Sequence, residues 1–264
     1  MSTLIRDYER FAKEAKEICK GRVYTDHLRR YAYGVDASCY SYLPKVVVKA
    51  EDEREVRRLI RLCQQCGTPF TFRAAGSSLS GQCSSEDVLI VCNDGFKKME
   101  VIDDGKALKC ECGVIGSDAN DLLKPYNRKI GPDPATLATA LVGGILNNNS
   151  SGMCCGTAQN SYKTIRSIRV VLLDGSILDT SDQKSIDQFL KEKPQMVEDI
   201  LQLRKDILAD EELTHLIHHK YKIKNTTGYG LNSLVDFEDI IDIINHLFIG
   251  SEGTLGFVSE IVYN

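Results

Sequence analysis

The chain has 264 residues, 42% of them hydrophobic and 27% charged, with a formal net charge of −4 at pH 7. These values are typical of a soluble globular protein with one large domain or two small ones. The net negative charge gives no support to nucleic-acid binding or a polybasic membrane contact. No apolar run approaches the ~18 residues of a membrane span, and the charged N-terminus lacks the apolar stretch of a signal peptide.

The first third of the chain predicts helices around a small parallel sheet. Residues 4–20 have the pattern of an amphipathic helix, and a second helix is predicted over 26–33. The apolar runs 44–50 and 68–74 are predicted strands. The segment between them, 51–67, predicts a helix with an acidic first turn and a glycine stop. This β-α-β order favours parallel pairing.

The rest of the chain predicts a second, mainly antiparallel sheet. DVLIVCN, KKMEVID and ALKCECG are predicted as consecutive strands, the last two joined by the turn Asp103-Asp104-Gly105-Lys106. IRVVLLDGSILDT repeats the pattern, with a turn at Asp174-Gly175. Residues 184–224 predict a mostly helical insertion, and a helix follows with Ile240, Ile243, Ile244 and Leu247 on one face.

The sequence ends inside FVSEIVYN, an alternating strand pattern with no turn after it, which suggests that the protein continues. A helix-rich lobe and an antiparallel lobe together predict an α+β fold. We place the small βαβ lobe at about 24–82 and the larger lobe, with its helical insertion, at about 83–264.

The ten cysteines are expected to be reduced thiols, because Cys154 and Cys155 are adjacent and there is no secretory signal. Cys63 and Cys66 form a CxxC pair, but the helical spacing around them favours buried thiols over a redox or metal site. His215, His218 and His219 resemble a ligand cluster; their polar, lysine-rich surroundings favour a solvated helix face.

Three segments beside predicted strands are poor in bulky side chains. They are the loop TFRAAGSSLSGQ (71–82), the stretch GPDPATLATALVGGILNNNSSGMCCG (131–156) and GSEGTLG (250–256). Backbone N–H groups and serine hydroxyls of such loops can form anion-binding concavities. A single loop of this kind is more often a plain turn, and Asn-rich runs are commonly held by their own hydrogen bonds. Neither GxGxxG after a strand nor GxxxxGK[ST] is present, so a diphosphate would be held in another way.

The order and spacing of these segments resemble the FAD-binding (PCMH-type) domain of the FAD-linked oxidases, the vanillyl-alcohol-oxidase-type flavoproteins. The likeness extends from about Tyr24 to Asn264 and is greatest to the D-lactate, glycolate and D-2-hydroxyglutarate dehydrogenase group. PKVVVKAEDEREVRRLIRLC is similar to the entry strand and helix of that family. SSGMCCGTAQNSY is similar to a large subgroup whose members continue into a substrate domain and an iron–sulfur region.

The resemblance implies a role in FAD binding for residues in all three segments. Around the pyrophosphate it places Arg73, Ala74, Ala75, Gly76, Ser77, Ser78, Leu79, Ser80 and Gly81. Along the flavin and ribityl path it places Pro132, Pro134, Gly143, Gly144, Asn148, Ser150 and Gly152. Near the adenine end it places Glu252, Gly253, Gly256 and Val258. No metal site is expected in this chain.

The sequence departs from the family pattern at two places. Relatives with covalent flavin carry a histidine in the first loop where this sequence has Ser77, which implies non-covalent FAD. The usual Tyr-Gly after the second motif is replaced by Thr157-Ala158-Gln159, which leaves the contacts there undefined.

By resemblance, the whole enzyme oxidises a D-2-hydroxy acid by hydride transfer to FAD. The catalytic residues, the substrate cap and any iron–sulfur cysteines are expected beyond Asn264. A small hydroxy acid and an electron acceptor or iron–sulfur region are the expected partners. Two other readings stay open: a non-catalytic nucleotide- or phosphate-binding module, and a flavoenzyme like the NADPH-dependent enolpyruvyl reductases. A cytoplasmic location is expected, with peripheral membrane association of the full enzyme left open.

Overall fold

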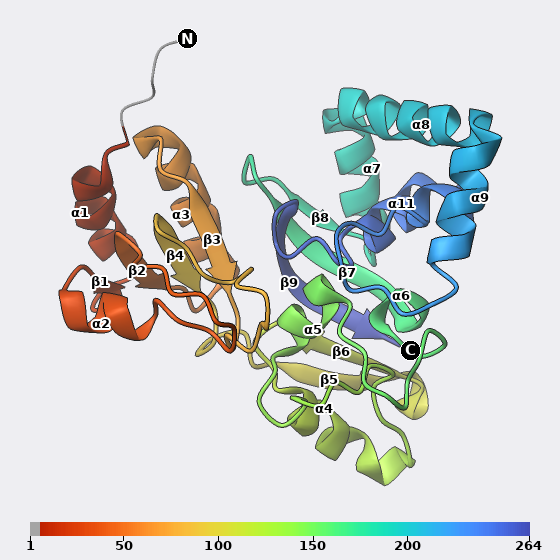
Figure 1. Ribbon diagram of the computed structural model, residues 1–264, viewed down its shortest axis with the longest axis horizontal. Coiled ribbons are helices and arrows are strands. Elements are labelled where there is room, and N and C mark those ends of the chain that lie inside the picture. Colours follow the sequence, from red (N-terminus) through yellow and green to blue (C-terminus); the bar gives the residue numbers. More distant parts are fainter. Residues whose placement is uncertain (1–5) are drawn as a thin grey trace.

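The computed structural model describes residues 6–264 as two lobes that lie side by side, each built on its own sheet (Figure 1). The first lobe consists of α1 (Tyr8–Ile18), β1 (Val23–Tyr24), α2 (His27–Ala32), β2 (Val46–Lys49), α3 (Glu53–Cys66), β3 (Phe70–Arg73) and β4 (Val88–Val91). Its sheet has the order β1-β2-β4-β3. β2, β4 and β3 run parallel, and β1 pairs antiparallel at the edge.

The helix α3 has clear sequence signals at both ends. The Asp52 side chain accepts a hydrogen bond of 2.8 Å from the backbone N–H of Glu55, and Gly67 ends the helix with a φ of 63°. Its apolar face, including Cys63 and Cys66, is buried in the same cluster as residues of α1, β2 and β4. The predicted β-α-β unit and the buried free thiols are therefore confirmed.

The predicted N-terminal helix is confirmed over Tyr8–Ile18. Its side chains Phe11, Ala12 and Ala15 are buried against the first lobe. Residues 4 and 5 of the predicted range lie outside the described residues. The second predicted helix is confirmed as α2.

The second lobe contains a five-stranded antiparallel sheet. Its strands are β5 (Met99–Ile102), β6 (Ala107–Glu111), β7 (Ile165–Leu172), β8 (Ile177–Asp179) and β9 (Gly256–Tyr263). The order is β5-β6-β9-β7-β8, so the last strand in the sequence occupies the centre of the sheet. Both predicted hairpins are confirmed, β5–β6 and β7–β8. Seven of the eight residues of β9 are buried, and Glu260 is the exception.

One strand prediction is wrong. Val88–Val91 was expected in the antiparallel sheet, but β4 lies between β2 and β3 in the parallel sheet of the first lobe. All four of its residues are buried. An uninterrupted apolar run is typical of a parallel strand covered on both faces, and the sequence carried that signal. The division into domains near residue 82 stays a prediction.

Helices and short turns complete the second lobe. They are η1 (Asp103–Gly105), α4 (Gly116–Leu123), η2 (Lys124–Tyr126), α5 (Val142–Asn148), α6 (Ser161–Thr164), α7 (Gln183–Glu192), α8 (Pro194–Ala209), α9 (Glu211–Lys220), α10 (Ser233–Asp236) and α11 (Ile240–Leu247). The predicted helical insertion corresponds to α7, α8 and α9, which project from the lobe (Figure 1). Ile207 and Ile217 of the insertion pack with Leu234 and Ile243 in a separate small core.

Apolar and ionic contacts join the two lobes. The Phe257 ring of β9 lies 5.0 Å from the Phe72 ring of β3 and 5.2 Å from the Phe96 ring. Arg169 of β7 donates to Glu53 of α3 at 2.8 Å. The ends of β3 and β9 are therefore held close together, and the loops at these ends meet.

Candidate functional site

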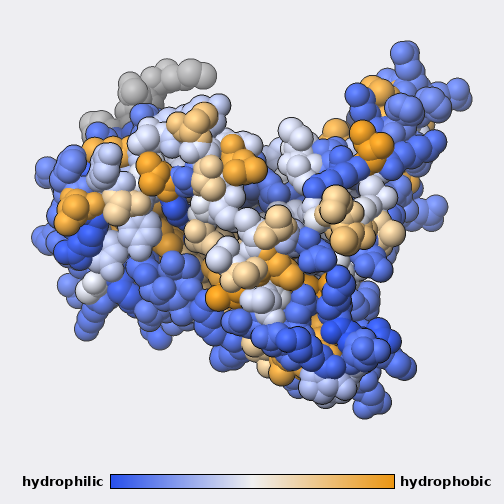
Figure 2. Space-filling model, turned by 60° about the horizontal axis from the view of Figure 1, so that its bottom comes forward, coloured by the Kyte–Doolittle hydropathy of each residue, from blue (hydrophilic) through white to orange (hydrophobic). Residues whose placement is uncertain are grey.

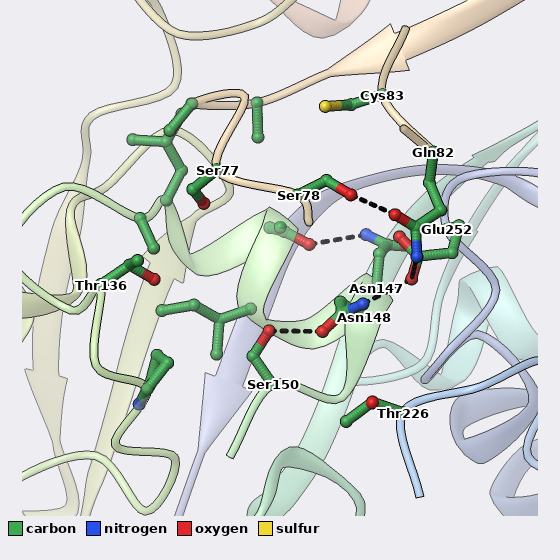
Figure 3. Close-up of a pocket in the computed structure, with 18 of the residues that line it drawn as sticks. Ser77, Ser78, Gln82, Cys83, Thr136, Asn147, Asn148, Ser150, Thr226 and Glu252 are labelled. Carbon is green, nitrogen blue, oxygen red and sulfur yellow. Dashed lines mark hydrogen bonds between the residues drawn. The ribbon is translucent and has the colours of Figure 1, made fainter. Parts of the chain in front are cut away.

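A cavity of about 1070 Å³ lies where the three loop segments of the sequence meet. Its walls come from the end of β3, from the stretch around α5, and from the turn that enters β9 (Figure 3). Leu79 and Met153, which also line it, are 79% and 98% exposed. On one face of the molecule, pale and orange residues gather between two mostly blue ends (Figure 2).

The structure brings nearly all of the predicted FAD-binding residues to this one cavity. The exceptions are Gly81 and Pro132. Gly81 has a φ of 78° and lies against the Tyr40 ring, and Pro132 is buried beside the cavity wall. The contacts that each residue makes with a ligand stay predictions.

The Arg73 side chain packs against the first loop beside Gly76. Its guanidinium donates to the backbone oxygens of Tyr33 at 3.0 Å and Val35 at 2.8 Å. A Cβ atom on Gly76, whose φ is 79°, would lie 2.3 Å from the nearest nitrogen of this guanidinium. The loop therefore needs glycine at position 76 for its backbone conformation and for the space that Arg73 occupies.

Small residues let the second segment approach its neighbours. A Cβ atom on Gly143 would lie 2.6 Å from the Cβ of Cys112, and one on Gly144 would lie 3.3 Å from the Cβ of Ala74. A Cβ on Gly152 would overlap the carbonyl oxygen of Asp133. Side chains at these glycines would push α5 and the following loop away from Cys112, Ala74 and Asp133.

A chain of side-chain hydrogen bonds connects all three segments (Figure 3). Ser150 Oγ donates to Asn148 Oδ1 at 2.7 Å, and Asn148 Nδ2 donates to Glu252 Oε1 at 2.6 Å. Gln82 Nε2 donates to the same Glu252 oxygen at 3.4 Å, and Gln82 in turn accepts from Ser78. Glu252 is thus the point at which the three segments meet.

The environment of Glu252 disfavours its charged form. Burial raises the pKa of the Glu252 carboxyl above its usual value, while the hydrogen bond from Asn148 acts in the opposite direction. Its backbone also has a positive φ of 53°, a conformation that costs free energy in a residue other than glycine. The surrounding loops must therefore hold the Glu252 carboxyl in its buried position and its backbone at a positive φ.

Sequence reasoning missed one wall of the cavity. Lys224, Thr226, Thr227 and Gly228, in the segment after α9, also line it. The Lys224 ammonium donates to the backbone oxygen of Ser151, and Asn149 Nδ2 donates to the backbone oxygen of Asn225 at 3.2 Å. The polar composition of this segment is typical of a surface turn, so the sequence does not predict that it lines the cavity. Only tertiary contacts place it there.

The predicted solvated helix face of the three histidines is confirmed. His215, His218 and His219 are exposed on α9. Within residues 6–264, no group of three His, Cys, Asp or Glu side chains could hold a metal ion. In the same part of the chain, no helix is long and apolar enough to cross a membrane.

Comparisons with known proteins show what the chain is similar to. A sequence family described as an FAD binding domain matches residues 44–181. The D-2-hydroxyglutarate dehydrogenases of Haemophilus influenzae and Pantoea ananatis are 23% and 26% identical to the chain over 93% and 91% of its length. The D-lactate dehydrogenase of Archaeoglobus fulgidus is 24% identical over 81% of the chain and 37% of its own length. The chain spans about a quarter of the length of the first two relatives.

Among solved structures, an alkyldihydroxyacetonephosphate synthase has the same fold. It superposes with a TM-score of 0.65 at 18% identity, over 100% of this chain and 41% of its own. A BBE-like protein of Physcomitrella patens gives a TM-score of 0.61 at 10% identity, over 96% of this chain and 43% of its own. These likenesses confirm the predicted α+β fold of the PCMH type.

Proposed function

Because the match over residues 44–181 shows that this chain belongs to the FAD-binding-domain family, we propose that it is the FAD-binding part of an oxidoreductase acting on D-2-hydroxy acids. A substrate of the D-lactate, glycolate or D-2-hydroxyglutarate type fits the names of the relatives. The observation that carries the proposal is the single cavity lined by all three glycine-, serine- and asparagine-rich segments.

The donor set of the cavity fits a diphosphate. Ser77, Ser78 and Ser80 line it, and the Arg73 guanidinium lies beneath the same loop. Burial disfavours the charge of one of the cavity's two carboxyl groups, and a lysine partly balances the charge of the other. The Asp133 carboxylate accepts a hydrogen bond from Lys129 at 3.1 Å, and the pKa of Glu252 is raised. An anionic group is therefore favoured next to the first loop.

The residues of this chain would bind and orient the cofactor. Backbone N–H groups of the first loop and its serine hydroxyls would donate to the diphosphate, with the charge of Arg73 below them. The chain of hydrogen bonds from Ser150 to Gln82 would hold the loops at a fixed separation. Because a Cβ on Gly144 would lie close to Ala74, the wall beside the ligand has no room for a larger side chain at position 144. When bound, the flavin ring accepts the hydride from the substrate.

We propose that the FAD is held without a covalent bond. The position at which covalent relatives carry a histidine is Ser77. The cysteines that line the cavity are Cys83, Cys92 and Cys112. Burial raises the pKa of Cys83 to about 11, and it also raises the pKa values of Cys92 and Cys112. Such thiols stay protonated near neutral pH and are poor nucleophiles.

The remaining groups of the whole enzyme are proposed to lie outside these residues. An iron–sulfur region and an electron acceptor would complete the electron path. Cluster ligands would come from other parts of the protein, because no group of three cysteine, histidine or acidic side chains within residues 6–264 could hold a metal ion. We propose a cytoplasmic location, which agrees with ten free thiols.

Reconstitution with flavin tests the proposal. The purified chain is titrated with FAD, and binding is followed by the visible absorbance and fluorescence of the flavin ring. Saturable binding at one FAD per chain supports the function. FMN and riboflavin serve as controls, because they lack the diphosphate and should bind more weakly. Absence of any FAD binding by the folded chain would favour a phosphate-binding module without flavin.

A further inference from the structure

Four charged side chains line the cavity: Arg73, Asp133, Lys224 and Glu252. Three of them have two hydrogen bonds or an ion pair within the protein. Arg73 donates to two backbone oxygens, Asp133 pairs with Lys129, and Glu252 accepts from Asn148 and Gln82. Lys224 has one hydrogen bond, to a backbone oxygen, and no ion pair among the described residues.

The Lys224 ammonium has three N–H donors. One of them donates to the backbone oxygen of Ser151. Among residues 6–264, no ion pair includes Lys224. Two donors and the full positive charge therefore remain for a ligand.

The Ser151 side chain provides a second, independent observation. Ser151 lines the cavity and is 5% exposed, yet its Oγ has no hydrogen-bond partner in the described part of the chain. A buried hydroxyl without a partner costs free energy, and a rotation of the Ser151 side chain toward the cavity would let its hydroxyl donate to a ligand there. The Lys224 ammonium and the unpaired Ser151 hydroxyl thus belong to two residues that are in direct contact.

The two cations of the cavity belong to different segments. Arg73 lies beneath Gly76 in the first loop, whereas Lys224 contacts Ser151 after α5. In Figure 3 the serines of the first loop, Ser77 and Ser78, lie on the opposite side of the opening from Ser150 and Thr226. We therefore expect a diphosphate held by the first loop to be bound next to Arg73, and Lys224 to remain available for a second anionic group.

We infer that Lys224 and the Ser151 hydroxyl form a second anion-recognition point, which binds the carboxylate of the small hydroxy acid. This inference rests on the proposed function. It places one substrate-binding group on this chain, in a segment outside the matched residues 44–181. The substrate carboxylate and the phosphates of the cofactor both offer anionic oxygens, so the cofactor is the other molecule that Lys224 could bind.

A matched control lies two residues away. Lys222 is exposed like Lys224, but it lines a separate cavity of about 440 Å³ behind the same segment. The segment 222–228 forms the wall between the two cavities, and Gly228 lines both. Loss of the Lys222 charge changes the net charge of the protein by the same amount without touching the proposed site.

The experiment compares Lys224→Met, Lys224→Arg, Ser151→Ala and Lys222→Met with the wild type. FAD affinity is measured first. Binding of D-2-hydroxyglutarate and D-lactate to the FAD-saturated proteins is then followed anaerobically by the change in the flavin spectrum. We expect Lys224→Met to lower acid affinity at least tenfold, which corresponds to about 1.4 kcal/mol. Lys224→Arg should retain most of the affinity, Ser151→Ala should lose part of it, and Lys222→Met should match the wild type.

The outcomes separate the two proposals. A tenfold loss of FAD affinity in Lys224→Met, with acid binding unchanged, assigns the anionic oxygen to the cofactor and overturns the substrate assignment. Equal affinities of wild type and Lys224→Met for both ligands overturn the recognition point altogether. The same follows if the wild type binds FAD but neither acid, and Lys224→Met keeps full FAD affinity. A wild type that binds no FAD overturns the proposed function, and the inference falls with it.

Discussion

Asn148 donates a hydrogen bond of 2.6 Å to Glu252, across 104 residues of sequence. Asn148 ends α5, and Glu252 lies in the turn that enters the central strand β9. The bond therefore links the second loop segment to the third. Because Glu252 also accepts from Gln82, loss of this bond would loosen the cavity on two sides.

The first prediction concerns this bond. Asn148→Ala should lower the free energy of unfolding by about 1–3 kcal/mol, because the half-buried Glu252 carboxyl loses its shortest partner. FAD affinity should fall as well. Urea denaturation and flavin titration measure the two effects. Gln183→Ala is the control, since its amide makes an exposed helical contact with Asp187. Equal stability of Asn148→Ala and wild type would show that the network carries no free energy.

The second prediction concerns pH. The pKa of Glu252 is higher in the folded chain than in the unfolded chain, where glutamate titrates near about 4.3. The folded state then binds the proton more tightly, so the contribution of Glu252 to stability is present at low pH and is lost as pH rises through the folded pKa. Glu252→Gln should remove this loss.

The pH prediction is tested with urea denaturation curves recorded between about pH 4 and pH 8, a range that begins near the pKa of glutamate in the unfolded chain and extends above it. The stability difference between Glu252→Gln and wild type should shift in favour of the variant as pH rises above about 4.3. A difference that does not change with pH would contradict a raised pKa.

The third prediction concerns Gly76. Gly76→Ala should cost more than the about 1–2 kcal/mol of an L-residue at positive φ, because its Cβ also meets the Arg73 guanidinium. FAD binding should be lost. Gly21→Ala is a matched control, because Gly21 has a similar φ of 74° and no atom within 4 Å of the added Cβ. Equal destabilisation of the two variants would mean that Arg73 gives way without cost. The larger Gly76→Val would disturb the loop itself and not only the space for a diphosphate.

The fourth prediction concerns the attachment of the flavin. Acid precipitation of the FAD-loaded chain should release all flavin into the supernatant, because Ser77 offers no imidazole and the cavity cysteines stay protonated. Flavin retained in the washed pellet would contradict this. The exposed Cys154 would then be replaced first, although neither it nor Cys155 lines the cavity.

The fifth prediction is that the isolated chain shows no significant turnover with D-lactate, glycolate or D-2-hydroxyglutarate. A base must lie within hydrogen-bond reach of the substrate hydroxyl. Within residues 6–264 no histidine lines the cavity. His246 is buried, with its ring 4.0 Å from the Phe237 ring, and burial lowers its pKa. Anaerobic bleaching of the flavin measures turnover. Rapid, stereospecific bleaching would place the base in this chain, with Glu252 and Asp133 as the first candidates.

The sequence by itself determined the local elements and the chemistry of the three loops. Asp52 and Gly67 mark the ends of α3, and the Asp174-Gly175 turn marks the hairpin of β7 and β8, because caps and turns depend on neighbouring residues. The glycines and serines of the first loop likewise signalled a close backbone approach, and the family resemblance supplied the residues to be tested.

Tertiary structure alone decided which strands pair and which distant residues share the cavity. β4 has the same local preference for an extended conformation in either sheet, and burial on both faces places it between β2 and β3. Lys224 contacts Ser151 across 73 residues, and no periodicity or turn signal in the segment after α9 predicts that contact. Such pairings depend on how separate apolar faces pack together, and that packing is a property of the whole chain.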